Sequence, residues 1–219
     1  MDEVWDFLKR NDIIFEWTNP SRGIVFPFEL KPEDFMAFAK EDLKENTERS
    51  FVNALSNIKR AIDCRILSLL YFLGVYNKAK KEKWNFPKNA DFLLKVGVLS
   101  PNILKKINWK RNELEHDFKK PKCEEVMDYF DIASLFLALT KTVLNTIIRE
   151  YYIVTKQSIS DVYGDYPNLG IKLNYEKDLI ELEFGNRTKK KKYEIHSNDE
   201  EAYTKILKCL VKRSTDSII

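Results

Sequence analysis

Two long amphipathic patterns constrain the fold of this chain more than any other feature. Over residues 47–73, and again over 123–156, apolar side chains recur at steps of three and four, the spacing of one face of an α-helix. Thr47 is a candidate N-cap for the first helix, and Gly74 lies near its end. At 1.5 Å per residue, the second helix would span about 45–50 Å. We therefore predict a mainly α fold, with a helical bundle over residues 46–157 built on two long antiparallel helices.

Shorter helices are predicted around these two. Pro32 is placed to begin one at its first turn. A basic connector at 75–87 leads to a short helix at about 88–96. The Ser-Pro pair at 100–101 has the residue types that open a further helix, which Pro121 stops.

Both ends of the chain are rich in β-forming residues. Residues 13–17 and 23–28 flank an Asn-Pro-Ser turn, which predicts a hairpin within an N-terminal unit of residues 1–45. After a turn-rich linker, residues 158–219 are expected to form a small antiparallel meander and a closing helix. The meander strands and the helix are expected at residues 169–175, 180–184, 193–195 and 197–211. The pattern is compatible with both β pieces sharing one sheet beside the bundle.

Composition narrows the class of protein. The 219 residues carry 37 basic and 34 acidic side chains, a balance that does not by itself point to nucleic acid. Cys64, Cys123 and Cys209 are dispersed and odd in number, so we expect buried free thiols in a reducing compartment. The sequence shows no signal-peptide pattern and no apolar run of membrane-spanning length. These features predict a cytoplasmic protein without a membrane partner.

The candidate site is the segment 110–118, which holds one of only two histidines. On a helical wheel Arg111 falls inside the apolar arc of its helix, where a charge is costly unless it is paired or functional. Asn112 and His116 lie one turn apart on another face. Because Arg111 and His116 are about 140° apart at 100° per residue, one ideal helix cannot direct both to one point. Either the helix loosens near His116, or a symmetric dimer brings two copies of the motif together.

These residue types suit the cleavage of RNA. Attack by the 2′-hydroxyl needs a base for that oxygen and an acid for the leaving 5′-oxygen, which two histidines in a dimer would supply. Arg111 would stabilise the phosphate and Asn112 would orient it. Lys110, Lys119 and Lys120 flank the motif and are candidates for holding RNA phosphates, although solvated helix charges explain them equally well. An incidental surface histidine beside a snorkelling arginine remains the alternative for the whole motif.

Other polar residues carry less weight. His116 and Cys123 cannot complete a usual four-ligand metal set, so we predict neither a metal nor a cofactor. His196 ends a predicted strand and is interpreted as a surface histidine. The run 189–192 consists of four lysines, and we interpret it as a solvated hairpin end, with RNA contact as the alternative.

The motif Arg111-Asn112-x-x-x-His116, set between the two long helices, resembles the HEPN superfamily, and the resemblance covers roughly residues 46–157. It implies a helical bundle, usually dimeric, and a metal-independent endoribonuclease of a toxin–antitoxin or antiviral defence system. It also implies an antitoxin or a nucleotidyltransferase-type protein as a partner. Some members use an acidic residue on the first long helix, for which Asp63 is the candidate here, with a solvated helix residue as the alternative.

Two rival hypotheses stay open beside the ribonuclease. One is a non-catalytic module of the same fold that binds RNA, a nucleotide or a protein. The other is a purely structural dimerisation domain.

Overall fold

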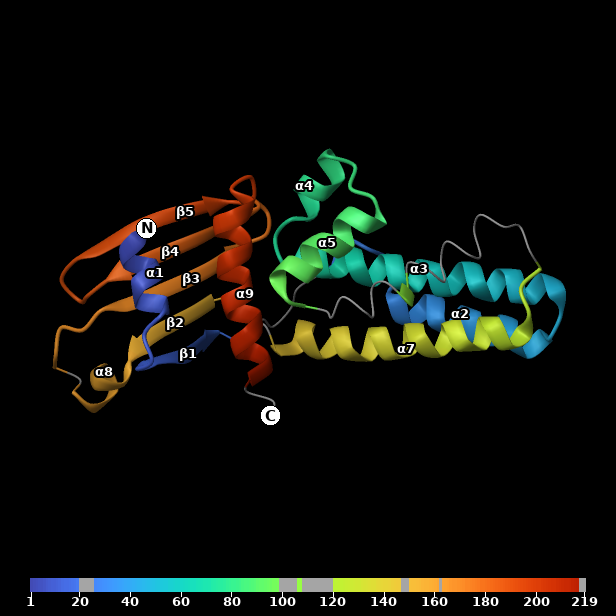
Figure 1. Cartoon of the computed structure of the whole chain (residues 1–219), viewed down its shortest axis with the longest axis horizontal. Helices are drawn as coiled ribbons and strands as arrows, with labels where there is room; N and C mark the ends of the chain where they lie inside the picture. Colours follow the sequence, from blue (N-terminus) through green and yellow to red (C-terminus); the bar gives the residue numbers. More distant parts are fainter. Residues whose placement is uncertain (20–25, 99–105, 108–119, 147–149, 162, 217–219) are drawn as a thin grey trace.

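The computed structural model of this chain has two lobes, one built on a β-sheet with helices around it and one made of helices (Figure 1). The structure describes residues 1–219 except 20–25, 99–105, 108–119, 147–149, 162 and 217–219. The described helices are α1 (Asp2–Leu8), α2 (Pro32–Glu45), α3 (Glu48–Phe72), α4 (Tyr76–Lys81), α5 (Phe86–Val96), α7 (Cys123–Thr146), α8 (Lys156–Ser160) and α9 (Glu200–Asp216). The strands are β1 (Ile13–Asn19), β2 (Glu150–Thr155), β3 (Asn168–Asn174), β4 (Leu179–Gly185) and β5 (Lys190–His196). The coarse prediction of a mainly helical protein with an antiparallel β part is confirmed.

The start of α3 follows from local hydrogen bonding. The Thr47 hydroxyl accepts from the backbone N–H of Ser50 at 3.1 Å, and the Ser50 hydroxyl accepts from the backbone N–H of Thr47 at 3.0 Å. Each side chain therefore satisfies a donor that the first turn leaves unpaired, as the sequence predicted for Thr47. Asn46 has a φ of 50°, and this left-handed residue reverses the chain between α2 and α3. The short connection makes α2 and α3 antiparallel neighbours.

The predicted antiparallel arrangement of the two long helices is wrong. α3 and α7 begin at the same end of the helical lobe, where Lys120 Nζ lies 2.9 Å from a Glu48 carboxylate oxygen, and both run toward the sheet (Figure 1). They are therefore parallel. A short loop would force neighbouring helices to be antiparallel, whereas the connection here spans residues 73–122, includes α4 and α5, and is long enough to allow either direction.

The second long helix is also shorter than predicted. α7 ends at Thr146, and residues 150–155 form β2 instead of a helical continuation to 156. The segment reads Glu-Tyr-Tyr-Ile-Val-Thr, and aromatic and β-branched residues favour a pleated, half-buried surface over a helix. Tyr151 and Ile153 are buried in the core.

All five strands belong to one antiparallel sheet in the order β1-β2-β3-β4-β5. The meander β3-β4-β5 is as predicted, but β1 pairs with β2 in place of the predicted hairpin partner, with Ile13 opposite Thr155. Residues 26–28 of that expected partner form no strand, and residues 20–25 lie outside the described part. The predicted units 1–45, 46–157 and 158–219 therefore each contribute strands to a shared sheet.

Smaller departures lie in the connections. The basic connector contains the short helix α4, and α5 begins at Phe86, slightly before the predicted start. The helix predicted between residues 100 and 121 lies outside the described residues apart from 106–107, which are helical, and 120–121, which are not. The closing helix α9 starts at Glu200, where the Asp199 carboxylate accepts from the Ala202 N–H at 3.2 Å.

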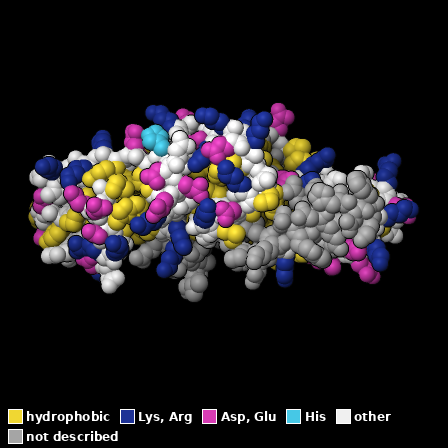
Figure 2. Space-filling view, turned by 45° about the horizontal axis from the view of Figure 1, so that its top comes forward, with side chains coloured by type: hydrophobic (Ala, Val, Ile, Leu, Met, Phe, Trp, Pro, Cys, Tyr) yellow, Lys and Arg dark blue, Asp and Glu magenta, His cyan; other side chains and the backbone are white. Residues whose placement is uncertain are grey.

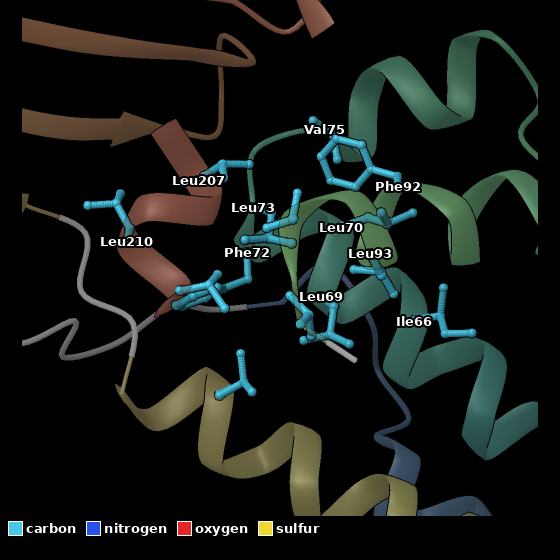
Figure 3. Packing of buried hydrophobic residues seen from close by; sticks show 14 of the residues in the cluster. Ile66, Leu69, Leu70, Phe72, Leu73, Val75, Phe92, Leu93, Leu207 and Leu210 are labelled. Carbon is cyan, nitrogen blue, oxygen red and sulfur yellow. The ribbon is translucent and has the colours of Figure 1, made fainter. Parts of the chain in front are cut away.

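One face of the sheet packs under helices. The Phe7 ring of α1 lies 5.3 Å from the Phe184 ring of β4, and the Lys191 amine lies 2.6 Å from the Glu3 carboxylate. α9 stands between the sheet and the helical lobe and contacts β5, α5 and α7 (Figure 1). Apolar side chains from α3, α5 and α9 come together there, among them Leu73, Leu93 and Leu207 (Figure 3). The hydrophobic core is therefore continuous from one lobe to the other.

Polar contacts fix the same junction. The buried Tyr203 hydroxyl of α9 donates to the carbonyl oxygens of Leu73 and Gly74, at 3.0 Å from each, and burial raises the pKa of this phenol. Asp178, in the β3–β4 turn, accepts from the Lys78 backbone N–H at 3.1 Å, and burial raises the pKa of its carboxyl group. The Lys78 amine donates to the Ser197 carbonyl at 2.6 Å. Both lobes are thus joined through the turn that follows α3.

We predict that Tyr203→Phe lowers the free energy of unfolding by about 1–3 kcal/mol, because two buried carbonyl oxygens lose their donor while the packing of the ring is retained. Urea denaturation followed by circular dichroism measures this. Tyr163→Phe is the control, since Tyr163 is 94% exposed and its replacement should leave stability unchanged. Equal stability of the two variants would contradict the role given to this hydroxyl.

Candidate functional site

Most of the residues predicted to form the site lie outside the part of the chain that the structure describes. These are Lys110, Arg111, Asn112, His116 and Lys119. Lys120 is described and exposed, and its amine forms the ion pair with Glu48 at the start of α3. An exposed ion pair contributes little stability and does not prevent the lysine from contacting a phosphate. The predicted contact of Lys120 with RNA therefore stays a prediction.

The two flanks of the motif segment are anchored in the helical lobe. On one side Ile107 is completely buried and lies in helical conformation. On the other side Pro121 is buried, and the Lys122 backbone N–H donates to the Glu125 carboxylate at 3.1 Å as α7 begins. A buried isoleucine and a buried proline thus hold the ends of a segment that carries an arginine, an asparagine and a histidine.

Asp63, the acidic candidate on the first long helix, lies in the C-terminal half of α3 and is half-buried. Its neighbour Cys64 is close to the Leu30 carbonyl, with 3.5 Å between sulfur and oxygen, and burial raises the pKa of this thiol. A thiol with a raised pKa is a poor nucleophile. Cys64, Cys123 and Cys209 are free thiols as predicted, but each is partly exposed and not fully buried.

Arg65 is a buried charge that the sequence pattern did not single out. It is only 4% exposed, and its guanidinium lies 2.6 Å from the Glu33 carboxylate at the start of α2. Its Nε has no hydrogen-bond partner among the described residues. Arg65 occupies an α3 position between apolar core residues, so a helical wheel carries the signal that would have found it. The ion pair ties α2 to α3 and is a structural feature of the bundle.

A hollow of about 510 Å³ lies on one face of the sheet. Gly170, which has no side chain, is among the residues that line it. Glu150, Glu181, Glu183 and Glu194 line it, together with Lys172 and Lys192. Lys172 lies 3.5 Å from Glu150, and Glu183 lies 3.2 Å from Lys190. Charged residues that alternate with buried ones are typical of the solvated face of an antiparallel sheet. The acidic surplus disfavours a polyanion such as RNA at this hollow.

The lysine run at the β4–β5 hairpin is partly neutralised by two carboxylates. Lys190 and Lys192 lie 3.2 and 3.8 Å from Glu183, and Lys191 pairs with Glu3. His196 is exposed, with its Nε2 3.9 Å from the Glu194 carboxylate. These contacts favour the interpretation of the run as a hairpin end and of His196 as a surface residue.

Positive and negative side chains are mixed on the surface, so a lysine or arginine indicates a binding face only where it forms no ion pair. Over the face that Figure 2 shows, Lys and Arg side chains are interspersed with Asp and Glu.

Within the described ranges, no group of three His, Cys, Asp or Glu side chains is arranged to hold a metal ion. None of the described helices is long and apolar enough to cross a membrane.

We predict an asymmetry between the two partners of the Arg65–Glu33 pair. Glu33→Ala leaves a buried guanidinium without its carboxylate and should lower the free energy of unfolding by about 2 kcal/mol or more. Arg65→Met removes the charge and the unpartnered Nε while keeping a long side chain, so its cost should be smaller. Chemical denaturation of both variants tests this, and a larger loss for Arg65→Met would show that the arginine does more than pair with Glu33.

No protein-family model, curated protein or solved structure matches this chain. Its function is therefore argued from its own residues.

Proposed function

We propose that this protein is a metal-independent endoribonuclease of the HEPN type, which cleaves RNA through attack of the 2′-hydroxyl on the adjacent phosphate. His116 acts as general acid and base, Arg111 stabilises the charge that develops on the phosphate, and Asn112 orients it. The reaction needs no cofactor. A bond forms between the 2′-oxygen and phosphorus, the bond from phosphorus to the 5′-oxygen breaks, and a 2′,3′-cyclic phosphate remains.

One observation carries the proposal. Arg111, Asn112 and His116 fall within a short segment whose two flanks, Ile107 and Pro121, are buried in the helical lobe. The described residues on both sides of the motif thus belong to the core of the helical lobe, and catalytic groups gain rate from a scaffold that positions them. The other histidine, His196, is exposed at the end of the sheet and pairs with a glutamate. The proposal includes a HEPN-type bundle in which α3 and α7 are parallel.

We further propose that the active form is a homodimer. Arg111 and His116 diverge on an ideal helix, so a second chain would complete each site and supply its second histidine. The exposed side of α7 suits such an interface, because Leu135 is 66% exposed and Leu139 is 52% exposed on the face opposite the core. Leucines of this exposure in neighbouring turns offer an apolar patch to a second copy.

The biological setting follows from the resemblance alone. A ribonuclease of this type would act in the cytoplasm, in a toxin–antitoxin or antiviral defence system. An antitoxin or a nucleotidyltransferase-type protein would hold it inactive.

We expect the protein to cleave single-stranded RNA in the presence of EDTA and to leave ends with 2′,3′-cyclic phosphate. His116→Ala should lower the rate by about 100-fold or more, as loss of a general acid–base group does. His196→Ala is the matched control, since it removes the other histidine from an exposed position and should leave the rate unchanged. The assay resolves labelled RNA on a denaturing gel and identifies the ends by mass spectrometry. Tight RNA binding without cleavage would favour the non-catalytic module instead.

The dimer makes a separate prediction. Leu135→Glu combined with Leu139→Glu places two charges on the proposed interface and should halve the molar mass measured by light scattering while cleavage is lost. Val52→Glu is the control, because Val52 is 49% exposed on α3 and its substitution adds a charge elsewhere on the bundle. A monomeric wild type that cleaves RNA would refute the shared site.

A further inference from the structure

The corner formed by α4 and the start of α5 concentrates positive charge. Residues 76–88 contain five lysines and a single acidic residue, a larger surplus than the +3 of the whole chain. Lys80, Lys81 and Lys83 are exposed, and no carboxylate pairs with them within the described ranges. We call these three residues the basic corner.

The one acidic residue of this region does not offset the basic corner. The Glu82 carboxylate accepts from the Lys88 amine at 3.0 Å and from Trp84 Nε1 at 2.8 Å. The hydrogen bonds from Trp84 and Lys88 lower the pKa of Glu82, which keeps it ionised and engaged with these two partners. Its charge is thus directed toward Lys88, and the charges of the basic corner remain available to a ligand.

An aromatic ring lies beside these lysines. The Trp84 ring packs against Phe92, with 5.7 Å between ring centroids, and remains partly exposed. The Lys88 amine lies 4.7 Å from its centroid, and the Lys78 amine lies 5.9 Å away. Both of these amines are already engaged, Lys88 with Glu82 and Lys78 with the Ser197 carbonyl, so the cations that remain for a ligand are those of the basic corner. Surfaces that bind single-stranded nucleic acids combine cations that pair with phosphates and aromatic rings on which bases stack.

Lys83 has an unusual backbone conformation at the end of α4. Lys83 has a φ of 53°, the left-handed conformation that favours glycine. It follows the end of α4, where the Trp84 N–H donates to the Ala79 carbonyl at 2.9 Å. Glycine or asparagine is the usual residue at this place after a helix. Glycine at this position would therefore remove the lysine side chain without straining the backbone.

The same test of pairing separates this corner from the other lysine-rich segment. In β5, Lys190, Lys191 and Lys192 all have carboxylate partners. The basic corner and the three β5 lysines thus carry the same number of positive charges but differ in their ion pairs, so the β5 lysines are a matched control for the basic corner.

We propose that the basic corner, with Trp84 beside it, binds the phosphate backbone of the single-stranded RNA substrate. This inference rests on the proposed ribonuclease function, because it assigns the surface that holds the substrate of that site. The recognition is by charge and independent of base sequence.

The experiment measures binding of a fluorescein-labelled, unstructured 12-nucleotide RNA by anisotropy over a range of salt concentrations, in the full chain carrying His116→Ala so that the RNA stays intact. Adding Lys80→Gln, Lys81→Gln and Lys83→Gln should weaken binding about ten-fold or more at low salt. It should also lower the slope of log affinity against log salt by about 2, because each lost phosphate contact removes about 0.7. Lys190→Gln, Lys191→Gln and Lys192→Gln is the matched control and should change both quantities little.

Lys83→Gly alone guards against a folding artefact. Glycine relieves the left-handed backbone, so this variant should be at least as stable in thermal unfolding and should still bind RNA more weakly. Unchanged RNA affinity in the triple variant, or an equal loss in the β5 control, overturns the proposal.

The two proposals fail separately. If RNA binds through the basic corner but wild-type protein never cleaves it, the ribonuclease is refuted and the binding surface stands. If cleavage occurs and the triple variant binds and cleaves like wild type, the ribonuclease stands and the basic corner is refuted.

Discussion

The turn that follows α3 determines how the two lobes sit against each other. Gly74 adopts a φ of 69°, and the Tyr203 hydroxyl approaches so closely that a Cβ at Gly74 would lie 2.6 Å from it. Only a residue without a side chain allows α9 to dock on the end of α3 in this way. The same turn presents the Lys78 N–H to Asp178 and the Lys78 amine to Ser197. Sheet, closing helix and bundle are thus positioned by a few residues.

Features of the fold that depend on residues close together in the sequence could be predicted, and features that depend on distant contacts could not. The N-cap of α3 and the meander β3-β4-β5 follow from neighbouring residues, and both are as predicted. The strand β2 was missed because a short run of apolar and aromatic residues after a helix fits a helical pattern as well as a buried strand. The partner of β1 and the direction of α7 relative to α3 depend on contacts between distant parts of the chain, which a periodicity does not record.

The candidate site shows the same division. Arg111, Asn112 and His116 stand out because histidine is rare in this sequence and arginine is out of place on an apolar face. The buried Arg65 went unnoticed, and the basic connector at 75–87 was recognised without a function being assigned to it. Lysines look alike in a sequence, and only the ion pairs of Lys190 to Lys192 distinguish those residues from Lys80, Lys81 and Lys83. Pairing is a property of the folded chain, so this part of the site required a structure.

The pairing of β1 with β2 has a consequence for how the chain is made. Ile13 lies opposite Thr155, so roughly 140 residues must leave the ribosome before the first strand meets its neighbour. During that interval α2, α3 and the segment with the candidate catalytic residues have already been synthesised, while the sheet has not closed. Contacts this distant in sequence form late, because the entropy of closing a long loop must be overcome first. The helical lobe is therefore synthesised almost entirely between the two strands that join, and the remaining strands and α9 follow after them.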